Sequence, residues 1–95
     1  MKFSFEVGVK EKHIVEFKFN QIIGNLSISI DQQRRVTDFR MFSLSLIKTY
    51  EFKVGKQEMH DVRIEKERKL LLAGFRKSKY KVFIDEVLSY EYEGW

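Results

Sequence analysis

Side chains that could support catalysis are few and scattered in this chain of 95 residues. Nucleophilic catalysis needs a serine, threonine or cysteine beside a general base. The chain has no cysteine, and most of its serines alternate with apolar residues, which is typical of the solvent-facing side of strands. No strand–turn–helix elbow that would present a nucleophile surrounds any serine. We therefore expect no catalytic residue and predict that the protein is not an enzyme.

The chain has two histidines, His13 and His60, that could bind a metal ion. Asp61 follows His60, but neighbouring residues of a strand point to opposite faces, so these two side chains should not converge on one ion. His13 stands at the start of a predicted strand and should face solvent. None of the five glycines falls in a GxGxxG or GxxxxGK phosphate-binding pattern. We predict no metal site and no cofactor.

Basic residues gather in one segment, where Arg76, Lys77, Lys79 and Lys81 are interleaved with aromatic residues. Residues 56–81 carry nine basic and four acidic residues, and the pI of the chain is about 9.4. These side chains could contact phosphates while the aromatic rings stack on bases. The alternative is a solvated, lysine-rich turn that keeps a strand edge from pairing with other chains. Binding of nucleic acid, or of another anionic partner, is therefore one of the functions kept open.

Tyrosines and glutamates alternate near the end of the sequence. Tyr90 and Tyr92 are separated by Glu91 and followed by Trp95. An aromatic face of this kind could bind a sugar, another small ligand or a protein partner, although ordinary sheets carry the same alternation. We keep these three aromatic residues as a possible ligand or partner face.

The overall composition is that of a folded domain. Hydrophobic residues make up 43% of the sequence, and the formal net charge is +4. No apolar run approaches the ~18 residues of a membrane span, and Glu6 and Lys10 interrupt the start of the chain where a signal peptide would be apolar. We expect a single domain over residues 1–95, in the cytoplasm and without a membrane partner.

Apolar and polar residues alternate through most of the chain, and this period of two predicts strands with one buried face. Within residues 36–55 the apolar positions change phase between Met41 and Phe42, which predicts a β-bulge there. Residues 65–69 are predicted to form a charged turn, or one helical turn at most. Residues 65–73 could be strand or helix, and we favour a strand because the segments on both sides are predicted strands. We identify no internal repeat. About eight or nine short strands follow, which favours an all-β antiparallel sandwich, with an open barrel as the alternative.

The residues on the apolar side of these strands form the predicted core. They are Phe5, Val7, Val15, Phe17, Leu26, Ile28, Ile30, Phe42, Leu44, Leu46, Phe52, Val62, Ile64, Val82 and Ile84.

The sequence FSLSLIKTYEFKVG at residues 42–55 resembles a motif of the Fas apoptotic inhibitory molecule family. In that motif an aromatic and two apolar residues alternate, and an aromatic–x–apolar–Gly ending follows a short turn. The matching positions are Phe42, Leu44, Leu46, Phe52, Val54 and Gly55. Further similarities lie at residues 13–17, 28–31, 74–75 and 80–85. The resemblance implies an eight-stranded antiparallel β-sandwich with a non-enzymatic, protein-binding role, and it implies no catalytic residues.

We therefore expect a non-catalytic protein-interaction module, present as a monomer or homodimer, whose protein partner the sequence does not identify. A nucleic-acid-binding protein, including one that blocks an enzyme acting on nucleic acid, is the second hypothesis. A small-ligand or carbohydrate-binding domain is the third.

Overall fold

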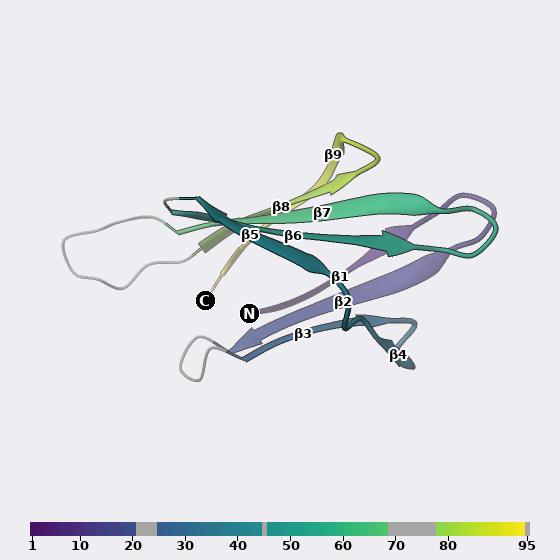
Figure 1. Ribbon diagram of the computed structural model, residues 1–95, viewed down its shortest axis with the longest axis horizontal. Coiled ribbons are helices and arrows are strands. Elements are labelled where there is room, and N and C mark those ends of the chain that lie inside the picture. Colours follow the sequence, from purple (N-terminus) through teal and green to yellow (C-terminus); the bar gives the residue numbers. More distant parts are fainter. Residues whose placement is uncertain (21–24, 45, 69–77, 95) are drawn as a thin grey trace.

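The computed structural model describes residues 1–20, 25–44, 46–68 and 78–94, and within these ranges it consists of strands, turns and loops without helices. The strands form two antiparallel sheets that stack on each other (Figure 1), in the orders β1-β2-β3-β4 and β5-β6-β7-β8-β9. The predicted antiparallel β-sandwich of about eight strands is confirmed. The two sheets contain nine described strands, and one of these, β4, has only two residues. The strands are β1 (Lys2–Val7), β2 (His13–Asn20), β3 (Asn25–Ile30), β4 (Arg34–Arg35), β5 (Arg40–Leu44), β6 (Ile47–Val54), β7 (His60–Glu67), β8 (Ser78–Ile84) and β9 (Val87–Gly94).

The core lies between the two sheets and is built from alternate residues of six strands. Most of the predicted core is buried, while Leu26 and Ile84 are half-buried against it. Two buried tyrosines, Tyr50 and Tyr80, were not predicted, and their rings meet Phe17 edge to face at centroid distances of 5.8 and 5.4 Å. The buried hydrophobic residues are Phe3, Phe5, Val7, Val15, Phe17, Ile28, Ile30, Val36, Tyr50, Phe52, Val54, Val62, Ile64, Tyr80 and Val82.

Three residues of the predicted core lie outside it. Leu46 is half-buried in the turn after β5 and is not among the side chains packed against the core. Phe42 and Leu44 are 51% and 79% exposed. The predicted bulge between Met41 and Phe42 is also absent, since β5 and β6 pair in continuous register from Arg40 to Leu44. The register shift in the described strands occurs instead beside Val82, where β8 pairs with β9. Without a bulge, the alternation carries Phe42 and Leu44 to the outer face of the sheet.

The predicted charged turn at residues 65–69 is also wrong over most of its length, because β7 continues to Glu67 and pairs with both β6 and β8. Residues 69–73, the remainder of the segment left open between strand and helix, lie outside the described residues. The strand continues through three charged residues because Glu65 and Glu67 face outward. Lys66, between them, points into the sandwich and is only 4% exposed.

The structure reveals an internal repeat that the sequence analysis did not identify. The pattern V-G-x-x-E-x-H-x-V begins at Val7 and again at Val54, 47 positions later. It covers the β1–β2 hairpin in the first copy and the β6–β7 hairpin in the second. An Ile-Asp pair also recurs, since β3 ends at Ile30 and β8 at Ile84, and the following Asp31 and Asp85 are each the first of two successive residues with positive φ. Strands β1–β3 therefore correspond to β6–β8, and β5 has no counterpart.

The two equivalent hairpin loops lie side by side at one end of the sandwich (Figure 1) and exchange glutamates. The Glu58 carboxylate accepts the backbone N–H groups of residues 9–11 at 2.7–3.1 Å. The Glu11 carboxylate accepts those of residues 56–58 at 2.7–3.3 Å. Each loop thus supplies three donors to the acid of the other, and these six hydrogen bonds connect the two sheets.

Each loop closes around a glycine that no other residue could replace without strain. Gly8 and Gly55 have φ values of 107° and 110°, in the region that favours glycine. A Cβ atom added to either residue would collide with the carbonyl oxygen of the glutamate three positions later, Glu11 or Glu58.

A histidine fixes each exchanged glutamate. His13 hydrogen-bonds Glu11 through Nε2 at 2.5 Å and Asp31 through Nδ1 at 2.7 Å. His60 is bound in the same way by Glu58 and Asp85. The predicted solvent-facing His13 is therefore half-buried between two carboxylates.

These contacts shift the pKa values of the bonded groups in opposite directions. The two flanking carboxylates raise the pKa of each histidine above 6.5. The histidine, together with the three N–H donors, lowers the pKa of Glu11 and of Glu58 to about 2. Charged imidazolium between ionised carboxylates is thus the favoured state.

We expect stability to be greatest in mildly acidic solution. The stabilisation from His13 and His60 is complete below pH 6.5 and is lost as the pH rises through their raised pKa values. The stabilisation from Glu11 and Glu58 is complete above pH 4.5 and is lost as the pH falls towards about 2. Melting temperatures measured across the acidic and neutral range should therefore rise and then fall. The double variant His13→Gln, His60→Gln should lose the decline on the neutral side, and an unchanged profile would contradict this assignment.

The placement of the core predicts which substitutions will destabilise the protein. Phe52 is 6% exposed on the inner face of β6, so Phe52→Ala should lower the free energy of unfolding by about 3–5 kcal/mol. Chemical denaturation would measure this loss. Phe42→Ala, on the exposed outer face, is the matched control and should cost much less. Equal losses in both variants would contradict the placement of the core.

Candidate interaction surface

The strand β5 forms one edge of the five-stranded sheet and carries the largest group of exposed apolar side chains in consecutive residues of the described chain. All five of its residues are exposed. Met41 and Phe42 are more than half exposed, and Leu44 is 79% exposed. Among the described strands, β5 is paired on one side, to β6, so its other side presents backbone groups to any strand that approaches.

Two apolar side chains of β5, Phe42 and Leu44, join Ile47 of β6 on the outer face, whereas Met41, the register partner of the buried Tyr50, has the opposite parity. Leu44 lies directly opposite Ile47, which is 40% exposed. The next pair on the same face is Phe42 opposite Thr49. Cross-strand neighbours of this kind are close enough to form one patch. We call Phe42, Leu44 and Ile47 the β5 patch. The patch has one charged neighbour on the strand, Arg40, where exposed edges usually carry lysine, proline or a bulge.

Another sheet edge, that of β1, is already covered from within the protein. The hydroxyl groups of Tyr90 and Tyr92 donate hydrogen bonds to the backbone carbonyls of Glu6 and Ser4 at 3.3 and 3.0 Å. The ring of Tyr92 also stacks on Phe3 at 4.2 Å. Of the predicted ligand face, the two tyrosines therefore join β9 to β1, with rings and hydroxyls engaged inside the protein. The third member, Trp95, lies outside the described residues.

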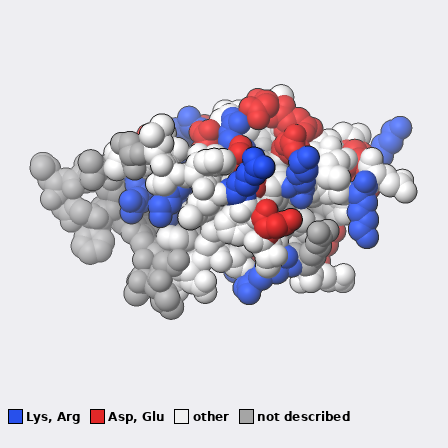
Figure 2. Space-filling view, viewed as in Figure 1, with Lys and Arg blue, Asp and Glu red and all other residues white. Residues whose placement is uncertain are grey.

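The predicted basic site is only partly described. Arg76 and Lys77 lie outside the described residues, whereas Lys79 and Lys81 lie on the outer face of β8. Each lysine stands between two glutamates of the neighbouring strands. Lys79 is opposite Glu67 and Glu93, and Lys81 is opposite Glu65 and Glu91. This alternation offsets the positive charge, and Figure 2 shows basic and acidic side chains interspersed on the face in view.

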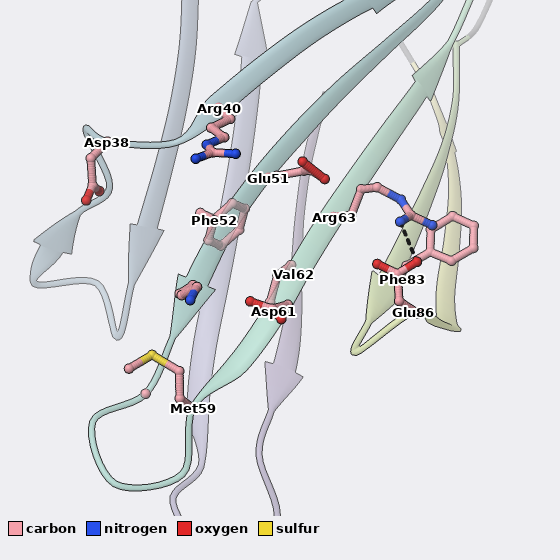
Figure 3. A pocket seen from close by; sticks show the side chains of 12 residues that line it. Asp38, Arg40, Glu51, Phe52, Met59, Asp61, Val62, Arg63, Phe83 and Glu86 are labelled. Carbon is pink, nitrogen blue, oxygen red and sulfur yellow. Dashed lines mark hydrogen bonds and ion pairs between the residues drawn. The ribbon is translucent and has the colours of Figure 1, made fainter.

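A shallow hollow of about 670 Å³ lies on the outer face of β6 and β7, next to the start of β5. Its charged groups come in opposite signs, and Figure 3 shows Arg40 above Glu51 and Arg63 directed at Glu86. Arg63 Nη1 lies 2.7 Å from the Glu86 carboxylate, and its guanidinium stacks on the Phe83 ring at 4.4 Å. The hollow therefore offers a partner a rim of mixed charge beside the apolar β5 patch.

No family model matches this chain, and no curated protein and no solved structure matches it either. The resemblance to the Fas apoptotic inhibitory molecule family therefore stays a prediction. Among the described residues there is no helix of the length and apolarity needed to cross a membrane.

The sequence contains the signal for the β5 patch but does not distinguish it from a buried strand. Phe42 and Leu44 alternate with serine just as buried strands do, and only the sheet order shows that this strand lies at an edge. The repeated V-G-x-x-E-x-H-x-V pattern was likewise present. A search at a spacing of 47 residues would have found it.

We expect Lys79 and Lys81 to contribute little to nucleic-acid affinity, because each lies between two glutamates. The double variant Lys79→Gln, Lys81→Gln should bind a mixed DNA and RNA panel as the wild type does, in titrations at low and moderate salt. A large loss of affinity, together with a shallower salt dependence, would instead mark these lysines as phosphate contacts.

Proposed function

We propose that this protein is a non-catalytic protein-interaction module that pairs with another polypeptide strand along β5. The observation that carries this proposal is the exposure of all five residues of an edge strand, three of them large and apolar. Strand addition to an open edge gains backbone hydrogen bonds, and side chains at alternate positions provide specificity.

The occupant that fits this edge best is β5 of a second copy. Antiparallel pairing about a two-fold axis at Phe42 would set Phe42 beside its own copy. It would also set Arg40 opposite Leu44 and Met41 opposite Ser43, so that no like charges face each other. The two five-stranded sheets would then continue into one. The outer apolar side chains of both copies would form a single stripe across the junction.

Because only five residues per strand pair, the interface is small by the standard of stable dimers. We therefore expect a dimer that dissociates on dilution, and sedimentation velocity over a concentration series would detect it. Phe42→Lys should abolish association, because it would set two lysines directly opposite each other at the two-fold axis.

Val87→Lys is the matched control. Val87 is 64% exposed and apolar but lies on β9, away from the β5 patch, so this variant should associate as the wild type does. A chain that stays monomeric at the highest soluble concentration would overturn self-pairing. So would association that Phe42→Lys leaves unchanged. A melting temperature close to that of the wild type would show that Phe42→Lys acts on the interface and not on the fold.

A further inference from the structure

A buried lysine stands where the repeat predicts an apolar residue. The pattern of the two halves aligns Val15, Phe17 and Phe19 of β2 with Val62, Ile64 and Lys66 of β7. Lys66 is 4% exposed, and its ammonium group lies 3.3 Å from the centre of the Phe19 ring. Lysine is almost never fully buried without a paired charge. The cation–π contact with Phe19 offsets only part of the cost of removing the ammonium group from water.

The nearest charges make this burial more costly. Lys48 lies directly opposite Lys66 on the same inner face of β6, and Arg68 follows two positions along the chain, where its N–H bonds to the Leu46 carbonyl. Burial and these two cations lower the pKa of Lys66 to about 8. Like charges directly opposite each other on a sheet are destabilising. The three side chains are called the cationic cluster below.

The acidic residues of the neighbouring strand positions do not compensate this charge. Glu51, Glu65 and Glu67 have the opposite parity and face outward. In the part of the chain that the structure describes, no member of the cationic cluster forms an ion pair. The strands of the facing sheet direct apolar residues inward, including Phe17 and Phe19.

Buried hydroxyl groups lie beside the cationic cluster. Tyr80 is the register partner of Lys66 on β8 and is fully buried, and its hydroxyl has no hydrogen-bond partner among the described residues. Ser78, on the same inner face, is 8% exposed. Burial raises the pKa of Tyr80 to about 12, although the nearby Ser78 side chain offsets part of this effect. The Tyr80 hydroxyl is therefore a neutral donor at physiological pH, and its contact with the Ser78 side chain does not reach hydrogen-bond geometry. A buried donor with so poor an acceptor is costly.

We propose that the cationic cluster and the Tyr80 hydroxyl bind a phosphate-class oxyanion. A phosphate dianion carries enough charge to offset more than one of the three cations, and its oxygens can accept hydrogen bonds from ammonium, guanidinium and hydroxyl groups together. A monocarboxylate offers less charge and fewer acceptors. The cluster runs from exposed Arg68 through half-buried Lys48 to buried Lys66, so its outer end is accessible to an anion from the surface. The shared chemistry fits both free phosphate and the monoester of a small molecule.

The test measures melting temperature and backbone amide shifts during titration with inorganic phosphate at constant ionic strength. Phosphate should raise the melting temperature in a saturable way, by roughly 4–8 °C once several times Kd is present. The amide shifts should move most at residues 48, 66, 68 and 80. Glycerol phosphate in a parallel titration distinguishes the sources. Tighter binding of the monoester identifies a phosphorylated small molecule as the ligand, and equal or weaker binding identifies free phosphate.

Lys66→Met is the decisive variant. It keeps the length of the side chain and removes a buried, uncompensated charge, so it should raise the melting temperature without phosphate. It should also weaken phosphate binding roughly tenfold to a hundredfold. Arg68→Gln, at an exposed position, should weaken binding without changing the fold, and it keeps the test valid if Lys66→Met does not fold.

Lys53→Gln is the matched control, because Lys53 lies on the same strand as Lys48 but is exposed on the outer face opposite Asp61. This variant should bind phosphate as the wild type does. The proposal is overturned if no saturable response to phosphate occurs. It is also overturned if Lys66→Met and Arg68→Gln keep the affinity of the wild type.

Discussion

The exchange of Glu11 and Glu58 between the two hairpin loops is the contact on which the arrangement of the sheets depends. Apart from this exchange and the two tyrosine hydrogen bonds from β9 to β1, the sheets are held mainly by apolar packing, which is not directional and tolerates sliding. The carboxylates add six hydrogen bonds between the loops, and each accepts from three consecutive N–H groups. Because the exchange is reciprocal, neither loop can keep its acceptor if the other moves. The sheets are therefore fixed in register at this end, and the core packs in one way.

The repeat also explains why β5 is placed where it is. The edge of β6 that pairs with β5 corresponds to the edge of β1 that points away from β2. In the first half, this edge is covered by the tyrosine hydroxyls of β9, which bond to the carbonyls of Ser4 and Glu6. The corresponding carbonyls would belong to Glu51 and Lys53, but β4 is too short to provide an equivalent of β9. The chain covers that edge with β5 instead, and the open edge moves one strand outward.

The sequence could predict the strands and most of the core, because alternation is a local property that side-chain burial reflects directly. It could not predict which strand lies at an edge. Phe42 and Leu44 have the same pattern as Val15 and Phe17, and their exposure follows from sheet order, which is set by contacts between distant segments. The missed Tyr50 shows a second limit, since a polar hydroxyl hides how much of a tyrosine ring can be buried.

The loop contacts were missed for a related reason. Glu11 and Glu58 have ordinary turn positions in the sequence. Each carboxylate accepts hydrogen bonds from the N–H groups of the other loop, about 47 residues away. His13 and His60 were assessed as metal ligands or as surface residues. In the structure they are held by carboxylates from their own half, Asp31 and Asp85 among them. Only the recurrence of the same spacing could have pointed to a common role.

Departures from the repeat then show where requirements other than folding act on the sequence. Phe19 and Lys66 occupy corresponding positions of the two halves and should have similar surroundings. Phe19 shows that an aromatic ring packs well at such a position. The Lys66 ammonium group lies 3.3 Å from the centre of that ring, and its positive charge is repelled by the positive charges of Lys48 and Arg68. An apolar side chain of similar length would avoid this cost. Lys66 therefore lowers stability at a position where the other half of the molecule has a more stabilising residue, Phe19. Sequences depart from the choices that favour the fold mainly at functional sites, so a bound ligand is the explanation that fits Lys66.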